Sequence, residues 1–237
     1  MLRISDLAAG YGRLQVLDGV NLKAEPGKII VIVGPNGSGK STLLKSIAGI
    51  TSIYRGRVDL DDLELSNMSP YGIAKAGVAY LPQTESVFAN LSVKENFRLA
   101  AYTIASSDYP SRVERALKVF PTLTPFLTRK AGTLSGGERQ MLAMAMAVMR
   151  EPRLIMFDEP TANLSPKISL QVLELITSLT REMNLTTLLV EQNARRALEN
   201  GDSAYLLVSG KVAYEGLARD LLAHQELARL YLGLRAA

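Results

Sequence analysis

The sequence of 237 residues contains no cysteine and a single histidine, His224. Without cysteine the chain can form no disulfide, use no catalytic thiolate and bind no Cys-ligated zinc. One histidine leaves few ligands for a transition-metal site. The N-terminal segment MLRISDLAAG holds no apolar signal-peptide core, and the longest apolar run, residues 141–149, is far shorter than the roughly 20 residues that span a membrane. We therefore expect any membrane contact to be made through a partner protein.

Blocks of like charge, internal repeats and low-complexity tracts are also missing from the sequence. The formal net charge is +4, but lysine and arginine are scattered singly, so a nucleic-acid groove is allowed without being indicated. Apolar residues make up 47% of the chain and charged residues 21%, as in ordinary folded proteins. Composition therefore predicts a globular protein with a substantial core. It does not indicate a nucleic-acid partner, and we expect none.

Short apolar runs rich in β-branched residues predict strands at residues 29–33, 77–81, 153–157, 186–190 and 203–208. Several of these runs are apolar at every position, which is typical of parallel strands that helices cover on both faces. Apolar residues recur every three or four positions in residues 41–50 and 165–183, which predicts helices there. This alternation of strand and helix indicates an α/β domain.

Two regions depart from the alternation. The segments LRISDL, GVNL and GRVDL, with turns at AGYG and EPGK, predict short antiparallel strands near the N-terminus. Residues 89–150 predict helices, with breaks at SSDYPS and PTLTP, and they lie between two predicted strands. We therefore expect residues 89–150 to be a helical insertion in the α/β domain.

The strand predicted at residues 29–33 runs directly into GPNGSGKST, which matches the pattern G-x-x-x-x-G-K-[ST]. Glycines let successive backbone N–H groups face a phosphate, Lys40 reaches the outer phosphates, and the Ser41 hydroxyl binds Mg²⁺. A glycine-rich turn before a helix is the alternative, and the flanking strand and helix favour the phosphate site. The candidate nucleotide-binding residues are Gly34, Asn36, Gly37, Ser38, Gly39, Lys40, Ser41 and Thr42.

Two adjacent acids, Asp158 and Glu159, follow the strand predicted at residues 153–157. At such a position Asp158 suits the shell of a magnesium ion, and Glu159 can polarise a water for attack on a γ-phosphate. Adjacent acids at the end of a strand are otherwise common in solvated loops. The catalytic interpretation therefore depends on the phosphate loop.

The segment LSGGERQ, residues 134–140, has two explanations. Ser135 and Glu138 match the S-x-x-E capping box of the helix that follows. The two glycines, Gly136 and Gly137, also leave unpaired N–H groups at the start of that helix, and these groups can hold an anion. Both explanations use the same helix geometry.

The segments GPNGSGKST, LSGGE and LIMFDEP occur in this order around the helical insertion, and they resemble the nucleotide-binding subunit of an ATP-binding-cassette (ABC) protein. LSGGE is the signature that separates this family from other P-loop ATPases. The resemblance covers essentially the whole chain and implies one nucleotide-binding domain over residues 1–237. It implies a P-loop NTPase (RecA-like) core with a parallel sheet, an N-terminal antiparallel β subdomain and an ABC-specific helical subdomain at residues 89–150. It also implies ATP and Mg²⁺ as cofactors.

Further roles follow from the resemblance, position by position. Tyr11 matches the aromatic residue that stacks on adenine. Gln83 matches the glutamine that contacts the metal and the attacking water and reports to the membrane partner. A turn tyrosine and a loop amide are the plain alternatives. Ser135, Gly136 and Gly137 would hold the γ-phosphate bound to the P-loop of a second subunit, so the resemblance implies a head-to-tail dimer.

Gln192 departs from the family pattern. The strand after the one that carries Glu159 generally ends in a histidine that contacts the γ-phosphate and the attacking water, and here LLVEQN places Gln192 there. Glutamine keeps a donor and an acceptor, but it cannot carry a proton near neutral pH as imidazole can. Glutamine orients water in other P-loop NTPases. We therefore expect a weakened but working catalytic set of Lys40, Glu159 and Gln192.

A second departure is the segment NLSP, in which Ser165 stands where most members have an aspartate. Together with LLVEQN, the short length and the tail ARLYLG, this departure makes the chain resemble the smaller ATPase subunit of importers for branched-chain amino acids. That group also includes urea and short-amide systems. Two different ATPase subunits pair in this group, and the partner generally keeps the histidine. Gln192 therefore predicts a heterodimer.

The sequence thus predicts the ATP-hydrolysing subunit of an importer, peripheral on the cytoplasmic face of the cell membrane. Its expected partners are a second ATPase chain, the permease subunits and, indirectly, a solute-binding protein. Residues 86–97 are expected to dock the permease through Phe88, Leu91 and Val93. One rival is an ABC ATPase acting on nucleic acid, which would carry tandem cassettes, a coiled-coil insertion or a zinc hook. The other is a mainly non-hydrolytic ATP-gated clamp, against which Glu159 argues.

Overall fold

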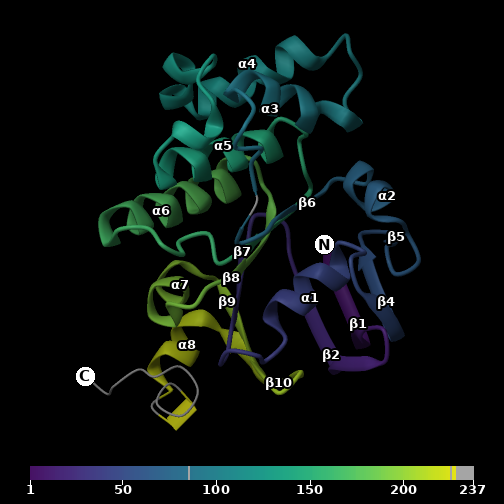
Figure 1. Cartoon of the computed structure of the whole chain (residues 1–237). Helices are drawn as coiled ribbons and strands as arrows, with labels where there is room; N and C mark the ends of the chain where they lie inside the picture. Colours follow the sequence, from purple (N-terminus) through teal and green to yellow (C-terminus); the bar gives the residue numbers. More distant parts are fainter. Residues whose placement is uncertain (85, 225, 228–237) are drawn as a thin grey trace.

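The computed structural model describes residues 1–84, 86–224 and 226–227. The tail ARLYLG, which contributes to the resemblance, lies outside these residues. The described chain forms one sheet of four strands and one of six, with helices around them (Figure 1).

The six-stranded sheet has the order β10-β9-β3-β8-β7-β6. Its strands are β3 (Ile29–Val33), β6 (Val78–Leu81), β7 (Leu154–Asp158), β8 (Thr186–Val190), β9 (Ser203–Val208) and β10 (Lys211–Leu217). Neighbours pair in parallel except β10 with β9. The five predicted strands lie in this sheet within one residue of their expected bounds. Because the parallel strands run in one direction, their carboxyl ends share one edge.

The four-stranded sheet is antiparallel and has the order β2-β1-β4-β5. Its strands are β1 (Leu2–Tyr11), β2 (Leu14–Ala24), β4 (Ser52–Leu60) and β5 (Leu63–Glu64). Inner side chains such as Leu7, Leu17 and Val20 are fully buried and share a core with the first helix. The antiparallel N-terminal region predicted from the sequence is therefore confirmed.

Helices cover both faces of the six-stranded sheet. The α-helices are α1 (Lys40–Ile47), α2 (Pro70–Lys75), α3 (Val93–Ala100), α4 (Tyr109–Val119), α5 (Gly136–Val148), α6 (Pro166–Glu182), α7 (Ala194–Asn200) and α8 (Ala218–Ala223). The described residues also form three short 3-10 helices, η1 (Ala101–Thr103), η2 (Pro121–Phe126) and η3 (Ala131–Thr133). The segment from α3 to α5 forms the top of the molecule in Figure 1. None of the described helices has the length and apolar character needed to cross a membrane.

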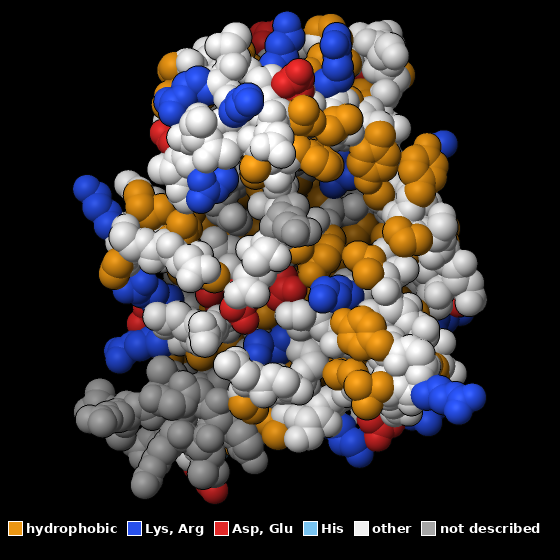
Figure 2. All heavy atoms as spheres, in the orientation of Figure 1, with side chains coloured by type: hydrophobic (Ala, Val, Ile, Leu, Met, Phe, Trp, Pro, Cys, Tyr) orange, Lys and Arg blue, Asp and Glu red, His pale blue; other side chains and the backbone are white. Residues whose placement is uncertain are grey.

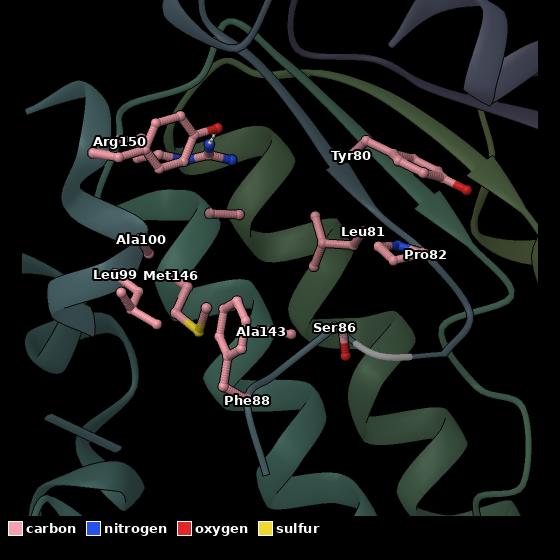
Figure 3. A pocket seen from close by; sticks show the side chains of 12 residues that line it. Tyr80, Leu81, Pro82, Ser86, Phe88, Leu99, Ala100, Ala143, Met146 and Arg150 are labelled. Atoms are coloured by element: carbon pink, nitrogen blue, oxygen red, sulfur yellow. Dashed lines mark hydrogen bonds between the residues drawn. The ribbon is translucent and has the colours of Figure 1, made fainter. Parts of the chain in front are cut away.

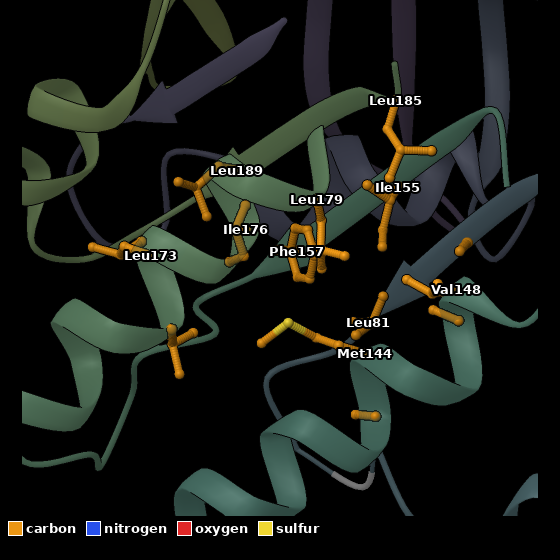
Figure 4. Close-up of a cluster of buried hydrophobic side chains, with 14 of the residues drawn as sticks. Leu81, Met144, Val148, Ile155, Phe157, Leu173, Ile176, Leu179, Leu185 and Leu189 are labelled. Carbon is orange, nitrogen blue, oxygen red and sulfur yellow. The ribbon is translucent and has the colours of Figure 1, made fainter. Parts of the chain in front are cut away.

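Successive strand residues face two different cores, because side chains alternate along a strand. Phe157 of β7 packs in a core with Met144 of α5 and Ile176 of α6 (Figure 4). Its neighbour Met156 lies in the second core, with α1 and the four-stranded sheet. Both residues are at most 1% exposed, and truncating a buried phenylalanine to alanine costs about 3–5 kcal/mol. The apolar runs of the sequence are therefore explained by burial on both faces.

Helix boundaries differ from the expected ones where local capping decides them. The helix predicted at residues 41–50 ends at Ile47, because Gly49 adopts a positive φ and the N–H groups of Gly49 and Ile50 bond back to Ser46 and Lys45. The break predicted at SSDYPS contains the start of α4, where Pro110 fits the first turn. The break predicted at PTLTP is instead the 3-10 helix η2.

Candidate functional site

Four segments meet at the carboxyl edge of the parallel sheet. The loop at residues 34–42 follows β3, Gln83 follows β6, Glu159 follows β7 and Gln192 follows β8. They enclose a cavity of about 460 Å³. Its lining residues are Val16, Asn36, Gly37, Gly39, Lys40, Ser41, Thr42, Gln83, Glu159 and Gln192. The structure therefore brings together most of the residues singled out from the sequence.

Two glycines of the 34–42 loop are required by backbone shape and close packing. Gly34 has a φ of 150°, and a Cβ there would lie 2.1 Å from the carbonyl oxygen of Leu207. Gly39 has a φ of 101°, and a Cβ there would lie 2.7 Å from Cδ2 of Leu17. Helix α1 begins at Lys40, so the last three residues of this segment, 40–42, form the first turn of the helix. The arrangement presents free backbone N–H groups at the helix start, which is a suitable place for a phosphate.

Lys40 lies in the wall of the cavity and is 6% exposed. Its Nζ donates to the carbonyl oxygens of Gly34 and Pro35 at 2.8 and 3.0 Å. Burial lowers the pKa of Lys40, while the nearby Glu159 and Asp158 act to raise it. The ammonium group is therefore fixed at the loop that would hold phosphates.

Asp158 is 5% exposed, and hydroxyl groups hold both of its carboxylate oxygens. Ser41 Oγ donates to Oδ1 at 2.9 Å, and Tyr80 Oη donates to Oδ2 at 3.0 Å. Burial, with the adjacent Asp158 charge, raises the pKa of Tyr80. Sequence analysis did not single out Tyr80. Its signal was its place on β6 three residues before Gln83, since β6 is the parallel neighbour of β7.

Glu159 and Gln83 are joined by a hydrogen bond, in which Gln83 Nε2 donates to Glu159 Oε2 at 2.7 Å. Glu159 has a φ of 52°, a left-handed conformation that is uncommon for a residue with a side chain. The Glu159 N–H donates to the carbonyl oxygen of Val190 at 2.9 Å. The end of β8 thus holds this backbone, and such strain often marks functional positions.

Oxygen donors gather at one side of the cavity. The Ser41 hydroxyl and the Asp158 carboxylate are in contact, and the carbonyl oxygen of Gln83 is not used in the bond to Glu159. Among the described residues there is no group of three His, Cys, Asp or Glu side chains that could hold a metal by themselves. This donor set fits Mg²⁺, which is commonly held by one or two carboxylates together with substrate phosphates.

Two further candidates lie differently with respect to the cavity. Gln192 lines it, at the point where the chain leaves β8. Tyr11 is 43% exposed at the end of β1 and is not among the lining residues, whereas Val16 of β2 is. Sequence analysis missed Val16, whose methyl carbon Cγ1 would lie 3.4 Å from a Cβ at Gly39. No short pattern around Val16 indicated this position.

The segment LSGGE forms the N-terminus of α5. Ser135 caps the helix, because its hydroxyl accepts from the Glu138 N–H at 3.3 Å while Glu138 Oε2 accepts from the Ser135 N–H at 2.6 Å. The capping box predicted from the sequence is therefore confirmed. Gly136 lines a second cavity of about 370 Å³, which shares Gln83 and Glu159 with the first, and the first cavity is not lined by residues 134–138. Within one chain the signature does not reach the P-loop.

Comparison with known proteins decides the family. A model of the ABC transporter family matches residues 17–162, more than half of the chain. The chain belongs to the ABC transporter family. The resemblance and the fold predicted from the sequence are thus confirmed, and this ABC ATPase binds ATP.

Two curated relatives match the ABC ATPase over nearly its whole length. It is 51% identical over 234 residues to the probable branched-chain amino acid transport ATP-binding protein LivF of Archaeoglobus fulgidus, with 99% of each chain covered. It is 36% identical over 233 residues to the high-affinity branched-chain amino acid transport ATP-binding protein BraG of Pseudomonas aeruginosa, with 98% of this chain and 100% of that protein covered.

A solved structure supports the same conclusion. The ATP-binding cassette MJ0796, in a dimeric post-hydrolysis state bound to ADP and Pi, has a TM-score of 0.79 and 26% identity to this ABC ATPase. The match covers 92% of this chain and 99% of that one. The cassette fold thus extends over almost the entire ABC ATPase.

Proposed function

We propose that this chain is the ATP-hydrolysing subunit of an importer for branched-chain amino acids. The names of the two relatives, LivF and BraG, give branched-chain amino acid transport, and both relatives match at nearly full length. The observation that carries the ATPase role is the meeting of the P-loop with Gln83, Glu159 and Gln192 around one cavity. A clamp that only bound ATP would not require the carboxylate of Glu159 at this place.

In this proposal the P-loop N–H groups and the start of α1 hold the β- and γ-phosphates, and Lys40 balances their charge. Ser41, Asp158 and the side-chain carbonyl oxygen of Gln83 would hold Mg²⁺ together with phosphate oxygens. Such a metal would supply positive charge that stabilises the transferred phosphoryl group. Tyr11, exposed at the end of β1, stacks on adenine.

Glu159 polarises the water that attacks the γ-phosphate. The hydrogen bond from Gln83 keeps the Glu159 carboxylate beside the cavity, where both residues line the wall. Gln192 orients the same water with its amide donor and carbonyl acceptor, and it stays neutral throughout. The site therefore has a base and a positioning amide, but no group that can become cationic as a histidine does.

The signature residues Ser135, Gly136 and Gly137 are proposed to complete the P-loop site of a second ATPase subunit. Support comes from their separation from the P-loop cavity within one chain and from the dimeric state of the similar MJ0796 cassette. The second subunit is a different chain with a histidine at the position of Gln192. The two sites of the dimer are then unequal, and the partner's site turns over faster.

Two substitutions at Gly136 test the signature. A Cβ there would lie 2.9 Å from Cδ2 of Leu164, the end of a flexible side chain, so Gly136→Ala should be absorbed by a small shift. Gly136→Asp adds a negative charge where a γ-phosphate would lie, so it should lower ATP hydrolysis by the transporter far more than Gly136→Ala does. The isolated chain should hydrolyse ATP slowly. Rapid, cooperative hydrolysis by the isolated chain that Gly136→Asp leaves unchanged would contradict the heterodimer.

The permease is proposed to dock in an apolar groove of about 410 Å³ between β6 and the helical segment above it. Figure 3 shows Phe88, Leu99 and Met146 close together on one side of the groove, and Figure 2 shows hydrophobic side chains gathered on this face. Phe88 is 55% exposed, while the buried Asn96 bonds to its N–H and C=O at 2.8 and 3.1 Å. An exposed aromatic ring on a fixed backbone suits a docking anchor.

Val93 was expected to be a docking anchor, and this expectation was wrong. Val93 begins α3 and is fully buried, because it packs in the core between this helix and the six-stranded sheet. The groove can be tested cleanly, since the chain has no native cysteine. A cysteine at Phe88 should crosslink to a permease subunit in the assembled transporter, and one at the exposed Lys211 of β10 should not. Crosslinking from position 211 but not from position 88 would show that the permease docks on the C-terminal segment instead.

Uptake by the reconstituted transporter tests the whole proposal. The chain is assembled with its permease, a second ATPase subunit and a solute-binding protein, on the cytoplasmic side of vesicles, and ATP-driven uptake of labelled leucine is measured. Uptake of leucine, lost with Glu159→Gln, supports the proposal. Uptake of urea or a short amide in place of leucine would reassign the solute and keep the ATPase role. Leucine uptake without ATP turnover would contradict the ATPase role.

A further inference from the structure

Glu191 is a buried acid for which the proposed hydrolysis has no use. Among the described residues only two carboxyl side chains are buried, Asp158 and Glu191, and Glu191 is 3% exposed. No lysine or arginine pairs with it in the described part of the chain. Taking a carboxyl group out of water without a cationic partner is unfavourable. A specific contact must therefore account for its place beside Gln192.

That contact joins the segments that leave two neighbouring strands. Glu191 Oε1 accepts from the Thr161 N–H at 3.0 Å, two residues beyond Glu159. The sheet itself ends with the bond from the Glu159 N–H to the carbonyl oxygen of Val190 at 2.9 Å. The Glu191 side chain thus adds one more link between the two segments beyond the end of the sheet. No backbone acceptor reaches Thr161 in the described structure.

Gln192 lies between two anchored neighbours. Before it, Glu191 is tied inward to Thr161, and after it, Asn193 caps α7 by accepting from the Arg196 N–H at 3.2 Å. The Gln192 side chain has no hydrogen-bond partner among the described residues, and it lines the cavity. Its backbone therefore depends on the two neighbours. The Thr161 side of the contact is fixed independently by the turn bond from the Ala162 N–H to the Glu159 carbonyl oxygen.

We infer that Glu191 is a positioning residue, which uses its hydrogen bond to the Thr161 N–H to hold Gln192 at the γ-phosphate end of the cavity. The inference rests on the proposed role of Gln192 in ATP hydrolysis. The hydrogen bond from the Thr161 N–H needs only an acceptor oxygen at residue 191, and the Glu191 carboxyl provides one whether it is protonated or ionised. Burial raises the pKa of Glu191, as does the charge of Glu159, while the bond from Thr161 lowers it. A neutral amide at position 191 should therefore serve as well.

The test is a double-mutant cycle on kcat and KM for ATP hydrolysis at this chain's site in the assembled transporter. Glu191→Ala should lower kcat by about as much as Gln192→Ala, up to roughly tenfold, and should change KM for ATP less than about twofold. The double variant should be no slower than Gln192→Ala alone, because the amide side chain that Glu191 positions is already absent. Glu191→Gln should restore kcat to within about twofold of the wild type. Glu174→Ala, at an exposed acid of α6, is the matched control.

Each contrary outcome has a distinct meaning. If Gln192→Ala leaves kcat unchanged, the proposed role of Gln192 fails and the inference fails with it. If Gln192→Ala lowers kcat but Glu191→Ala does not, only the inference is overturned. The same holds if the two effects multiply in the double variant, or if Glu191→Gln is as slow as Glu191→Ala. Loss of nucleotide binding in Glu191→Ala with kcat kept would show a structural role only.

Discussion

The two walls of the nucleotide cavity are built in different ways. One wall is the continuous loop of residues 34–42, whose backbone shape depends on glycines at positive φ. The other is made by Gln83, Glu159 and Gln192, three side chains that come from the ends of three different strands. The first wall acts through backbone N–H groups and tolerates little added volume. The second acts through side-chain chemistry, so it can accept an exchange such as glutamine for histidine.

The largest expected effect is on the side-chain wall, from Glu159→Gln. The amide keeps the shape and can still accept from Gln83, so ATP should bind with nearly unchanged affinity. Loss of a general base lowers turnover by about 10²–10⁴-fold. Single-turnover hydrolysis and titration with a fluorescent ATP analogue measure the two quantities, with Glu174→Gln as control. Turnover near the wild-type rate at this site would remove Glu159 from the mechanism.

Lys40→Ala changes the loop wall instead, and it should reduce the affinity for ATP. The ammonium group is buried at the loop, and hydrogen bonds to charged groups contribute about 1.5–3 kcal/mol, which corresponds to about 10–100-fold in affinity. Lys45→Ala, on the same helix but outside the cavity, should bind ATP as the wild type does. Equal affinity in the Lys40→Ala variant by calorimetric titration would refute the phosphate-binding assignment.

The contrast between the walls also explains what the sequence could predict. The loop was recognisable because its residues are contiguous, and each glycine has a local backbone reason. The fully apolar runs predicted the parallel strands, since burial on both faces leaves no polar alternation. The roles of Gln83 and Gln192 came from the family resemblance, because no local sequence pattern indicates that the segments after β6 and β8 line the same cavity. Strand order, which places β7 between them, was needed for that.

Contacts across strands were the part that sequence could not provide. The bond from Tyr80 to Asp158 joins residues 78 positions apart, and nothing around either one indicates the other. The place of Val16 in the cavity wall depends on how the four-stranded sheet packs against the loop. Val93 was misassigned because an apolar residue at a helix start can face either side. Its orientation depends on the core between α3 and the sheet.

Gln192→Ala should have a smaller effect than either change above. If the amide only orients water, its loss costs this site no more than about tenfold in rate, or about 1.4 kcal/mol of barrier. ATP affinity should stay the same, because the P-loop wall is untouched. Gln192→His sharpens the comparison, since it should raise turnover at this site towards that of the partner's site. A loss far above tenfold in Gln192→Ala would mean that glutamine does more than orient water.

The smallest expected effect is a change in thermal stability, and it comes from Glu191, the buried acid beside Gln192. Burial raises the pKa of Glu191 in the folded state above its ordinary value of 4.5, so the folded chain keeps the Glu191 proton to higher pH than the unfolded chain does. Between those two pKa values the folded state binds more protons, and its stability falls as pH rises. Glu191→Gln cannot titrate and avoids this loss. The Tm of the variant relative to the wild type should therefore increase from pH 4 to pH 8, in thermal scans with Glu174→Gln as control. A difference that stays constant or shrinks as pH rises would show that the folded state does not favour the protonated acid.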